Sequence, residues 1–193
     1  GISPGTKLRY NHIHDIESYR YGGWGLYTDE GSSGILLENN LVYRTKSAGF
    51  HQHYGRENVI RNNICAFGEE AGIMRTRVED HLSFVFERNI VISDNGRMAK
   101  GGGWERGKSA MINNLYYDVN DNAMDFAGGS FEEWQAKGLD YQSVIANPRF
   151  MNLQEGDFTL KAGSPAIGLG FMPFDVSDAG PRPIRDEERE RGD

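Results

Sequence analysis

Three short segments in the N-terminal half of the chain carry most of the side chains that could do chemistry. Each starts at a glycine and runs through an apolar residue into polar ones: Gly25-Leu26-Tyr27-Thr28-Asp29-Glu30, Gly49-Phe50-His51-Gln52-His53-Tyr54 and Gly72-Ile73-Met74-Arg75-Thr76-Arg77. Alternate residues of an extended strand share a face, so Tyr27 should lie beside Asp29, and His51 beside His53. If the glycines align on neighbouring strands, carboxylates and imidazoles meet on one face, as acid–base catalysis requires.

Hydrolysis of a glycosidic bond is one chemistry open to these groups. That reaction uses two carboxyl groups, one to protonate the leaving oxygen and one to act as nucleophile or to activate water. We expect Asp29 to be one of them, with Glu30 or Glu70 as its partner. His51 and His53 would hold the charge state of Asp29 or bind sugar hydroxyls.

Arginine and aromatic side chains next to this cluster are candidates for substrate binding. Arg75 and Arg77 suit an acidic substituent, although strict alternation turns both inward unless a bulge intervenes. Trp24 ends an aromatic loop and, like Tyr27, offers a ring against which a sugar can pack. Aromatic loops also serve as simple packing, and that alternative stays open.

A metal site is a further interpretation of the same cluster. Asp29, His51 and His53 form an acceptable open set of ligands. The spacing of two histidines around one residue is a weak signal, however, because His12 and His14 repeat it at a predicted corner. We therefore predict no metal here.

The elements that position these residues follow from an internal repeat. A short pattern that ends in asparagine recurs with Asn at positions 11, 40, 63, 89 and 114, so successive copies are 29, 23, 26 and 25 residues apart. A period in the twenties without a helical signature indicates one coil of a β-solenoid per repeat. Asparagines in register predict a ladder of side-chain hydrogen bonds from coil to coil.

Columns read down the repeats agree with stacked coils. The residues three before the asparagine are all apolar and are predicted to point inward: Leu8, Leu37, Ile60, Phe86 and Met111. The next column alternates in sign over its first four members, as neighbours on a solvated face should, and is predicted to point outward: Arg9, Glu38, Arg61, Glu87 and Ile112. The fold predicted is therefore all-β, a right-handed parallel β-helix of about five to seven coils.

The pattern decays after Asn114. Ser130 and Glu133 form a capping box, and Gly138 ends a predicted short helix near the C-terminus. Segments 158–160 and 163–167 are expected to supply the last strands, and 171–174 to cap the end of the solenoid with the helix. Residues 1–180 thus form one β-helix domain, and 181–193 form a charged tail that we expect to be disordered.

Composition excludes several classes of protein. The formal net charge of −7 argues against a nucleic-acid partner bound through a general basic surface. Cys65 is the only cysteine, so an internal disulfide and a thiolate zinc site are excluded. The sequence contains no apolar run near the roughly 18 residues of a spanning helix, so we expect no membrane partner.

The sequence resembles bacterial right-handed β-helix proteins of the pectate-lyase-like superfamily over nearly all of residues 5–183. Besides the Asn repeats, the segments that carry the resemblance are 22–34, 49–55, Asn147-Pro148-Arg149-Phe150, Gly156-Asp157-Phe158 and Gly163-Ser164-Pro165-Ala166. The longer segments look like carbohydrate-active members, nearest to glycoside hydrolase family 141, whose catalytic residues do not match here one by one. The resemblance implies a polysaccharide substrate of plant type or acidic character, and secretion or export to the periplasm of a bacterium.

Two alternatives to hydrolysis remain. One is a polysaccharide lyase, with Arg75, His51 or Lys100 as the base that abstracts a proton beside a uronate. Calcium is implied for such lyases, with Asp29 and Glu30 as its hard oxygen ligands, whereas hydrolysis needs no cofactor. The other is a noncatalytic carbohydrate-binding or structural solenoid, because fold does not determine function.

The N-terminal end of the solenoid is expected to need a cover. An open end exposes apolar core and unpaired strand edges, and no residue before Thr6 is suited to cap them. We expect preceding coils of the same protein, or another chain, to cover this end.

Overall fold

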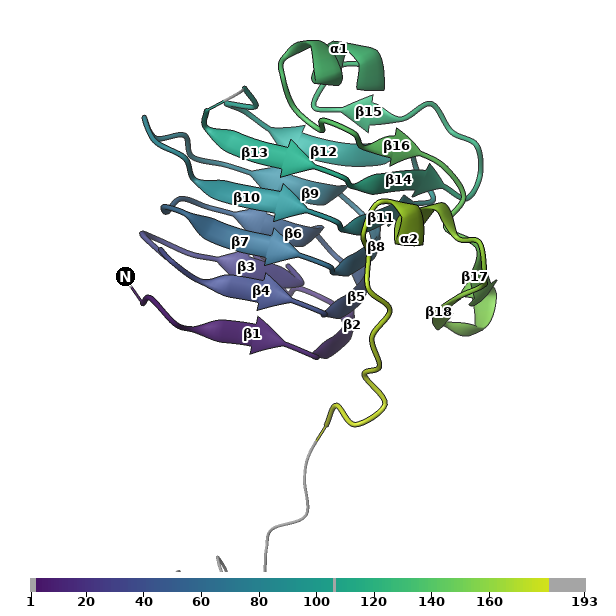
Figure 1. Cartoon of the computed structure of the whole chain (residues 1–193). Helices are drawn as coiled ribbons and strands as arrows, with labels where there is room; N and C mark the ends of the chain where they lie inside the picture. Colours follow the sequence, from purple (N-terminus) through teal and green to yellow (C-terminus); the bar gives the residue numbers. More distant parts are fainter. Residues whose placement is uncertain (1–2, 106, 181–193) are drawn as a thin grey trace, which may run out of the picture.

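The structure, a computed structural model that describes residues 3–105 and 107–180, is a parallel β-solenoid of about six turns (Figure 1). Strands from successive turns stack into three parallel sheets. The β1 sheet contains, in order, β1 (Lys7–Arg9), β4 (Leu36–Glu38), β7 (Asn58–Arg61), β10 (Phe84–Glu87) and β13 (Ser109–Ile112). The β2 sheet contains β2 (His12–Ile16), β5 (Leu41–Thr45), β8 (Ile64–Gly68), β11 (Ile90–Ser93), β14 (Leu115–Asp118) and β16 (Val144–Ile145). The β3 sheet contains β3 (Leu26–Thr28), β6 (Ala48–Gln52), β9 (Ala71–Arg75), β12 (Arg97–Gly101) and β15 (Asp125–Phe126).

The inward columns predicted from the repeats form the core. The β1 sheet pairs Leu37 with Ile60 in parallel register, and Ile60 with Phe86 and then Met111, and all four are buried. Leu8, in the first turn, is 37% exposed, because β1 is the edge strand of its sheet. The prediction of an inward apolar column is thus confirmed, and the N-terminal turn leaves part of it open.

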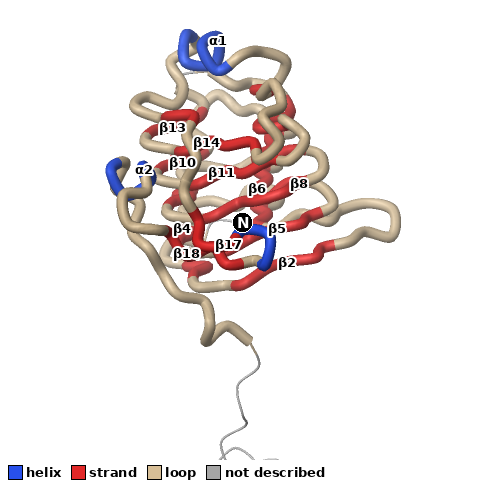
Figure 2. The backbone as a smooth tube through the Cα atoms, turned by 90° about the vertical axis from the view of Figure 1, so that its right-hand side faces the viewer, coloured by secondary structure: helices blue, strands red, loops and turns tan. Residues whose placement is uncertain are grey.

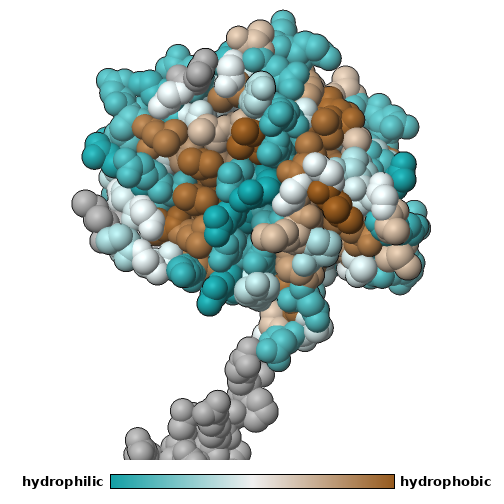
Figure 3. All heavy atoms as spheres, in the orientation of Figure 1, coloured by the Kyte–Doolittle hydropathy of each residue, from teal (hydrophilic) through white to brown (hydrophobic). Residues whose placement is uncertain are grey.

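The outer side of the β1 sheet carries the predicted charged column. Glu38 accepts hydrogen bonds from Arg61, at 2.8 Å from Nη2, and lies 3.9 Å from Arg9. A hydrophobic stripe runs beside this hydrophilic one, and both are visible in Figure 3. In parallel register, the neighbouring outward column consists of Leu36, Val59, Val85 and Ala110. Ion pairs between turns therefore contribute to the stacking of this face, by about 0–1 kcal/mol each at such exposure.

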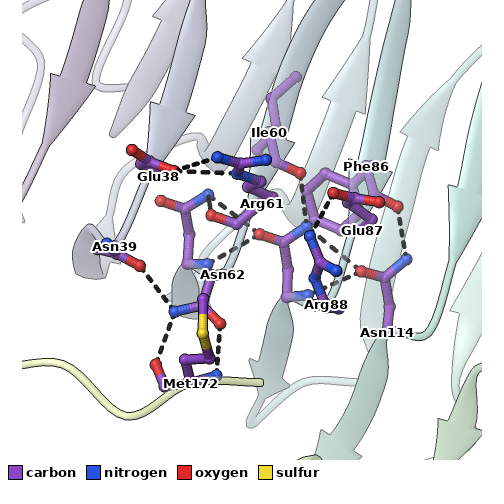
Figure 4. A network of polar contacts seen from close by, with 12 residues as sticks. Glu38, Asn39, Ile60, Arg61, Asn62, Phe86, Glu87, Arg88, Asn114 and Met172 are labelled. Carbon is purple, nitrogen blue, oxygen red and sulfur yellow. Dashed lines mark hydrogen bonds and ion pairs between the residues drawn. The ribbon is translucent and has the colours of Figure 1, made fainter. Parts of the chain in front are cut away.

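The asparagine ladder lies at the corner between the β1 and β2 sheets. Asn63 Oδ1 accepts both the backbone N–H and the Nδ2 of Asn40 at 2.9 Å, and Asn89 Oδ1 accepts the same two groups of Asn63 at 2.9 and 3.0 Å. The same side-chain contact joins Asn11 to Asn40 at 2.7 Å. It also joins Asn89 to Asn114 at 3.3 Å (Figure 4). The predicted ladder is confirmed.

The first asparagine of each Asn-Asn pair has a different function from the second. Asn39, Asn62 and Asn113 have φ of 56°, 54° and 57°, the left-handed region that Asn tolerates better than most residues. That conformation turns the chain sharply into the β2 sheet. The pair therefore combines one residue that makes the corner with one that binds the next turn.

The aligned glycines that open the strands of the β3 sheet are required by close packing inside the solenoid. A Cβ at Gly49 would lie 2.7 Å from the Cβ of Cys65, on the facing sheet. Gly25 and Gly72 face Val42 and Val91 in the same way. Glycine at these positions lets the interior column of the β2 sheet approach the β3 sheet, which keeps the solenoid thin.

The C-terminal end of the stack is capped by α1 (Phe131–Ala136), as predicted. Ser130 and Glu133 form the capping box, and the buried Trp134 packs into the core. The buried Asp140 accepts a hydrogen bond from Trp134 Nε1 at 2.6 Å and one from Asn114 Nδ2 at 2.9 Å. Asp140 thus ends the asparagine ladder, because its carboxyl oxygens accept hydrogen bonds and donate none to a further turn.

The segment after the cap covers the outer side of the β2 sheet, contrary to two predictions (Figure 2). It contains an antiparallel hairpin, β17 (Phe150–Asn152) and β18 (Asp157–Leu160), with the 3-10 turn η1 (Leu153–Glu155) between them. The predicted strand over 163–167 is wrong, because Ser164 caps a short helix, α2 (Pro165–Gly168), that starts with proline. Phe171 and Phe174 do not cap the end but pack beside the β2 sheet.

A tie between side chain and backbone holds this cover in place. Asn62 Oδ1 accepts from the N–H of Met172 at 2.7 Å, and Asn62 Nδ2 donates to the carbonyl of Met172 at 2.7 Å (Figure 4). In Figure 1 the same segment, in yellow, runs back down the stack from α2. Residues at the C-terminal end of the domain are therefore bound to its middle turns.

The predicted charged tail, 181–193, lies outside the described residues. Within the described ranges, no helix is both long and apolar enough to cross a membrane.

Candidate functional site

The outer face of the β3 sheet brings the predicted site residues together. Tyr27, His51 and Met74 lie in one column of parallel register, and Lys100 of β12 continues it. Asp29, His53 and Thr76 follow two positions later on their strands or just beyond them. Alternation and the aligned glycines, both visible in the sequence, thus place histidines and carboxylates of successive turns on one surface.

Aromatic rings cover one part of this face. Trp24 stacks on Tyr27 with ring centroids 4.2 Å apart and 15° between planes, and its ring lies 5.3 Å from that of His51. Tyr21 contacts Trp24 edge-on at 5.0 Å and is itself 82% exposed. Tyr27 therefore covers one face of the Trp24 ring. Tyr21 is the most exposed ring of the group.

A hydroxyl joins the two histidines. Thr76 Oγ1 lies 2.9 Å from Nε2 of His51 and 2.9 Å from Nδ1 of His53. Burial, and secondarily His53, lower the pKa of His51 to about 4, so this imidazole is neutral at pH 7. Its other nitrogen, Nδ1, is buried without a hydrogen-bond partner among the described residues.

The predicted carboxylates Asp29 and Glu30 lie at the exposed end of the cluster. Asp29 accepts a hydrogen bond from the hydroxyl of Tyr27 at 2.8 Å, and this bond is the main reason that the pKa of Asp29 is lowered. Glu30 approaches Nε2 of His53 at 3.9 Å. Asp29 is therefore ionised at neutral pH, ready to act as a nucleophile, a base or a hydrogen-bond acceptor.

Glu70, the third predicted carboxylate, lies on the other side of His51. It accepts from Lys100 at 2.6 Å, and this ion pair lowers the pKa of Glu70. The neighbouring Glu69 pairs with Lys46 at 2.6 Å in the same way. Asp29 and Glu70 both act electrostatically on His51, which places the imidazole between two negative charges.

A hollow of about 330 Å³ opens over His51, His53 and Glu70, while Asp29 and Glu30 lie outside its lining. Its lining includes the aromatic loop and the centre of the polar cluster, chiefly Tyr21, Trp24, His51, His53, Glu70 and Thr76. A hollow of this size, lined by both rings and polar groups, is in the range of small-ligand sites.

Arg75 is not available to a ligand, which corrects its prediction as a substrate-binding residue. The side chain points into the solenoid, where Nη1 donates to the carbonyl of Gly103 at 2.9 Å and Nη2 donates to Ser83 at 2.7 Å. Strict alternation had indicated this orientation. Arg77, by contrast, is exposed and lies over the ring of Tyr54 at 4.2 Å, so it remains on the surface near the site.

Sequence reasoning did not find Thr76 or Tyr21 as members of the site. Thr76 stands in the segment that begins at Gly72, but a threonine carries no distinctive signal until both its neighbours are known to be histidines. Tyr21 was visible only as part of an aromatic loop.

No metal centre is apparent in the described ranges, where no three His, Cys, Asp or Glu side chains are grouped as ligands. Comparison with known proteins adds no relative to this geometry. No protein-family model matches the chain, and neither does any curated protein or solved structure.

Proposed function

We propose that this protein is a carbohydrate-active enzyme, a glycoside hydrolase that binds its polysaccharide on the outer face of the β3 sheet. The observation that carries the proposal is the position of neutral His51 between two carboxylates, Asp29 and Glu70, beside the stacked rings of Trp24 and Tyr27. Rings bind the apolar faces of sugars, and the carboxylates and imidazoles meet their hydroxyls.

In this proposal Asp29 is the ionised carboxylate and Glu70 is the acid. The bond from Tyr27 keeps Asp29 charged, as a nucleophile or a water-activating base must be. Glu70 must be protonated to serve the leaving oxygen, so a bound sugar has to separate it from Lys100. Loss of that ion pair would raise the pKa of Glu70. Glu30, next to His53, would then contribute to binding, not to bond cleavage.

Noncatalytic binding of glycan is the second candidate, and one observation favours it. The pKa values of Asp29 and Glu70 are both lowered in the free protein, whereas a glycosidase acid usually has a raised pKa. A lyase has less support, because Arg75 is buried and Lys100 is paired with Glu70, which leaves His51 alone among its proposed bases.

Binding and cleavage can be tested separately. Trp104 and Trp134 are buried, so a change in tryptophan emission on adding glycan would report on the half-exposed Trp24, and Trp24→Phe should abolish it. Cleavage is measured on a panel of plant and algal polysaccharides, by new reducing ends and by the ultraviolet absorbance of unsaturated uronates. Reducing ends without that absorbance, lost in Asp29→Asn and Glu70→Gln, would support hydrolysis.

Glu69→Gln is the matched control, since Glu69 adjoins Glu70 in sequence but pairs with Lys46. It should keep most of the activity. Binding without any new chain end would select the noncatalytic function, and uronate absorbance would select the lyase. A chain that neither binds nor cleaves any glycan contradicts the proposal.

A further inference from the structure

Three side chains on the outer face of the β3 sheet stand in the order of a nucleophile, a base and an orienting carboxylate. Oγ1 of Thr76 lies 2.9 Å from Nδ1 of His53, and Oε1 of Glu30 lies 3.9 Å from Nε2 of the same ring. The three come from successive turns, because Glu30 follows β3, His53 follows β6 and Thr76 follows β9. Enzymes activate a hydroxyl for acyl transfer with this arrangement.

The surroundings of His53 set the direction in which the proton of Thr76 can move. A carboxylate beside Nε2 favours a proton on that nitrogen, so the neutral ring has its lone pair on Nδ1 and accepts from Thr76 there. Thr76 has one proton, so the second contact of Oγ1, with Nε2 of His51 at 2.9 Å, is donated by His51. The two histidines thus hold the hydroxyl with its proton directed at His53.

We propose that this protein hydrolyses carboxylic esters that carry a small acyl group such as acetyl, with Thr76 as nucleophile, His53 as general base and Glu30 as a positioning residue. Oγ1 of Thr76 attacks the ester carbonyl carbon while its proton passes to Nδ1 of His53. The bond from that carbon to the alcohol oxygen then breaks, and the alcohol leaves with the proton. Water, deprotonated by His53, attacks the acyl-threonine, and the carboxylic acid leaves as Thr76 regains a proton.

The nucleophile and the base are accessible to a ligand. Thr76 is exposed, and Thr76 and His53 both line the hollow of about 330 Å³. The positive charge that His53 gains during the reaction is stabilised by two carboxylates, since Asp29 also acts electrostatically on this ring.

The negative charge that develops on the carbonyl oxygen has to be met by a side chain. The backbone N–H groups of Thr76 and Arg77 donate to the carbonyls of Gln52 and His53, so neither serves as an oxyanion donor. Arg20 lines the same hollow, and its guanidinium is a permanent cation with several donors. Arg20→Gln is therefore expected to lower kcat.

Turnover of p-nitrophenyl acetate by the full chain tests the proposal. Thr76→Val and His53→Gln should each lower kcat by at least about a hundredfold, while Thr76→Ser, which keeps a hydroxyl, should remain active. Glu30→Gln should lower kcat by about tenfold with KM unchanged, because Glu30 acts through His53. A fluorophosphonate should form one covalent adduct, located on Thr76 by peptide mass mapping, and the adduct should be absent from Thr76→Val.

His14→Gln is the matched control for ester cleavage by surface imidazoles. His14 is an exposed histidine that lies 2.6 Å from the carboxylate of Asp15, on another sheet. This variant should retain native turnover. All variants should keep the native melting temperature, since the side chains that they change are exposed or line the hollow.

Native turnover in Thr76→Val or in His53→Gln, or an adduct on a residue other than Thr76, would overturn the proposal. The esterase and the proposed glycosidase can fail separately, because this inference does not rest on glycan binding. Release of acetate depends on Thr76, whereas new reducing ends depend on Asp29 and Glu70.

Discussion

The asparagine ladder makes a sharp prediction for Asn63→Asp, a change that keeps the shape of the side chain and removes its donors. Asn63 Nδ2 donates to the carbonyls of Leu37 and Arg61 at 3.0 and 2.9 Å, and to Asn89 Oδ1 at 3.0 Å. A carboxylate in its place would face three oxygen acceptors in a fully buried site. It would keep the acceptor function toward Asn40.

The magnitude follows from the bonds lost. Each buried acceptor left without its donor costs about 1–3 kcal/mol, and an unpaired buried charge adds to this. We expect Asn63→Asp to lower the free energy of unfolding by about 3–5 kcal/mol at neutral pH. Burial beside acceptors raises the pKa of the introduced carboxyl above its unfolded value of about 3.9.

The pH dependence has a definite sign. Below the unfolded pKa the carboxyl is protonated in both states and can donate one hydrogen bond, so the loss of stability is smallest there. As the pH rises, the unfolded state ionises first, and the stability of the variant falls until the pH passes the folded pKa. The defect relative to the native protein should therefore grow from acidic to neutral pH.

Urea unfolding followed by circular dichroism at several pH values measures this effect, with Asn39→Asp as the matched control. Asn39 Oδ1 accepts from Asn62 Nδ2 at 2.7 Å, and a carboxylate preserves that bond. The control should stay within about 0.5 kcal/mol of the native protein. Equal stability of Asn63→Asp and the native protein at neutral pH, or an equal loss in both variants, would refute the ladder as a source of stability.

Three further substitutions separate packing from binding. Arg75→Ala should lower the free energy of unfolding, measured with urea, by about 3–5 kcal/mol, and it should leave glycan affinity unchanged. Weaker glycan binding by a stably folded Arg75→Ala variant would show that this residue does belong to the site. Gly72→Ala should cost about 1–3 kcal/mol by overpacking against Val91, and the double variant with Val91→Ala should recover part of that loss, so strict additivity would contradict the close approach. Asp140→Asn should cost about 2–4 kcal/mol in the same assay, because an amide cannot accept from all the donors around it, Trp134 Nε1 included; a neutral effect would mean that the carboxyl is not ionised in the folded protein.

The repeat was sufficient to predict the solenoid because its signal is cumulative. One Asn-Asn pair indicates only a turn, whereas Asn40 and Asn63 in the same column indicate a hydrogen bond between turns, as the structure shows at 2.9 Å. A repeated feature also made the arrangement of the candidate site predictable. The aligned glycines gave the register that brings Tyr27 beside His51 and His51 beside Met74.

The contacts that could not be predicted from the sequence are long-range and each depends on a single residue. The tie from Asn62 to Met172 spans 110 residues and has no counterpart in another turn within the described part of the chain. Asp140 follows the helix α1 by a few residues and looks like an ordinary loop acid, yet it is fully buried at the end of the ladder. Neither role can be inferred from composition or period, because each depends on where the irregular C-terminal segment returns to the stack.

The apolar runs of the β2 sheet carry a signal that helps to select the candidate face by elimination. Leu41, Val42 and Tyr43, like Ile90, Val91 and Ile92, are apolar without alternation, which is typical of strands covered on both faces. The C-terminal segment covers that outer side. The β1 sheet presents alternating charges that pair with one another between turns. The β3 sheet is left as the face that directs rings and polar side chains outward around the hollow lined by Trp24 and His51, and we therefore expect substitutions there to change binding far more than stability.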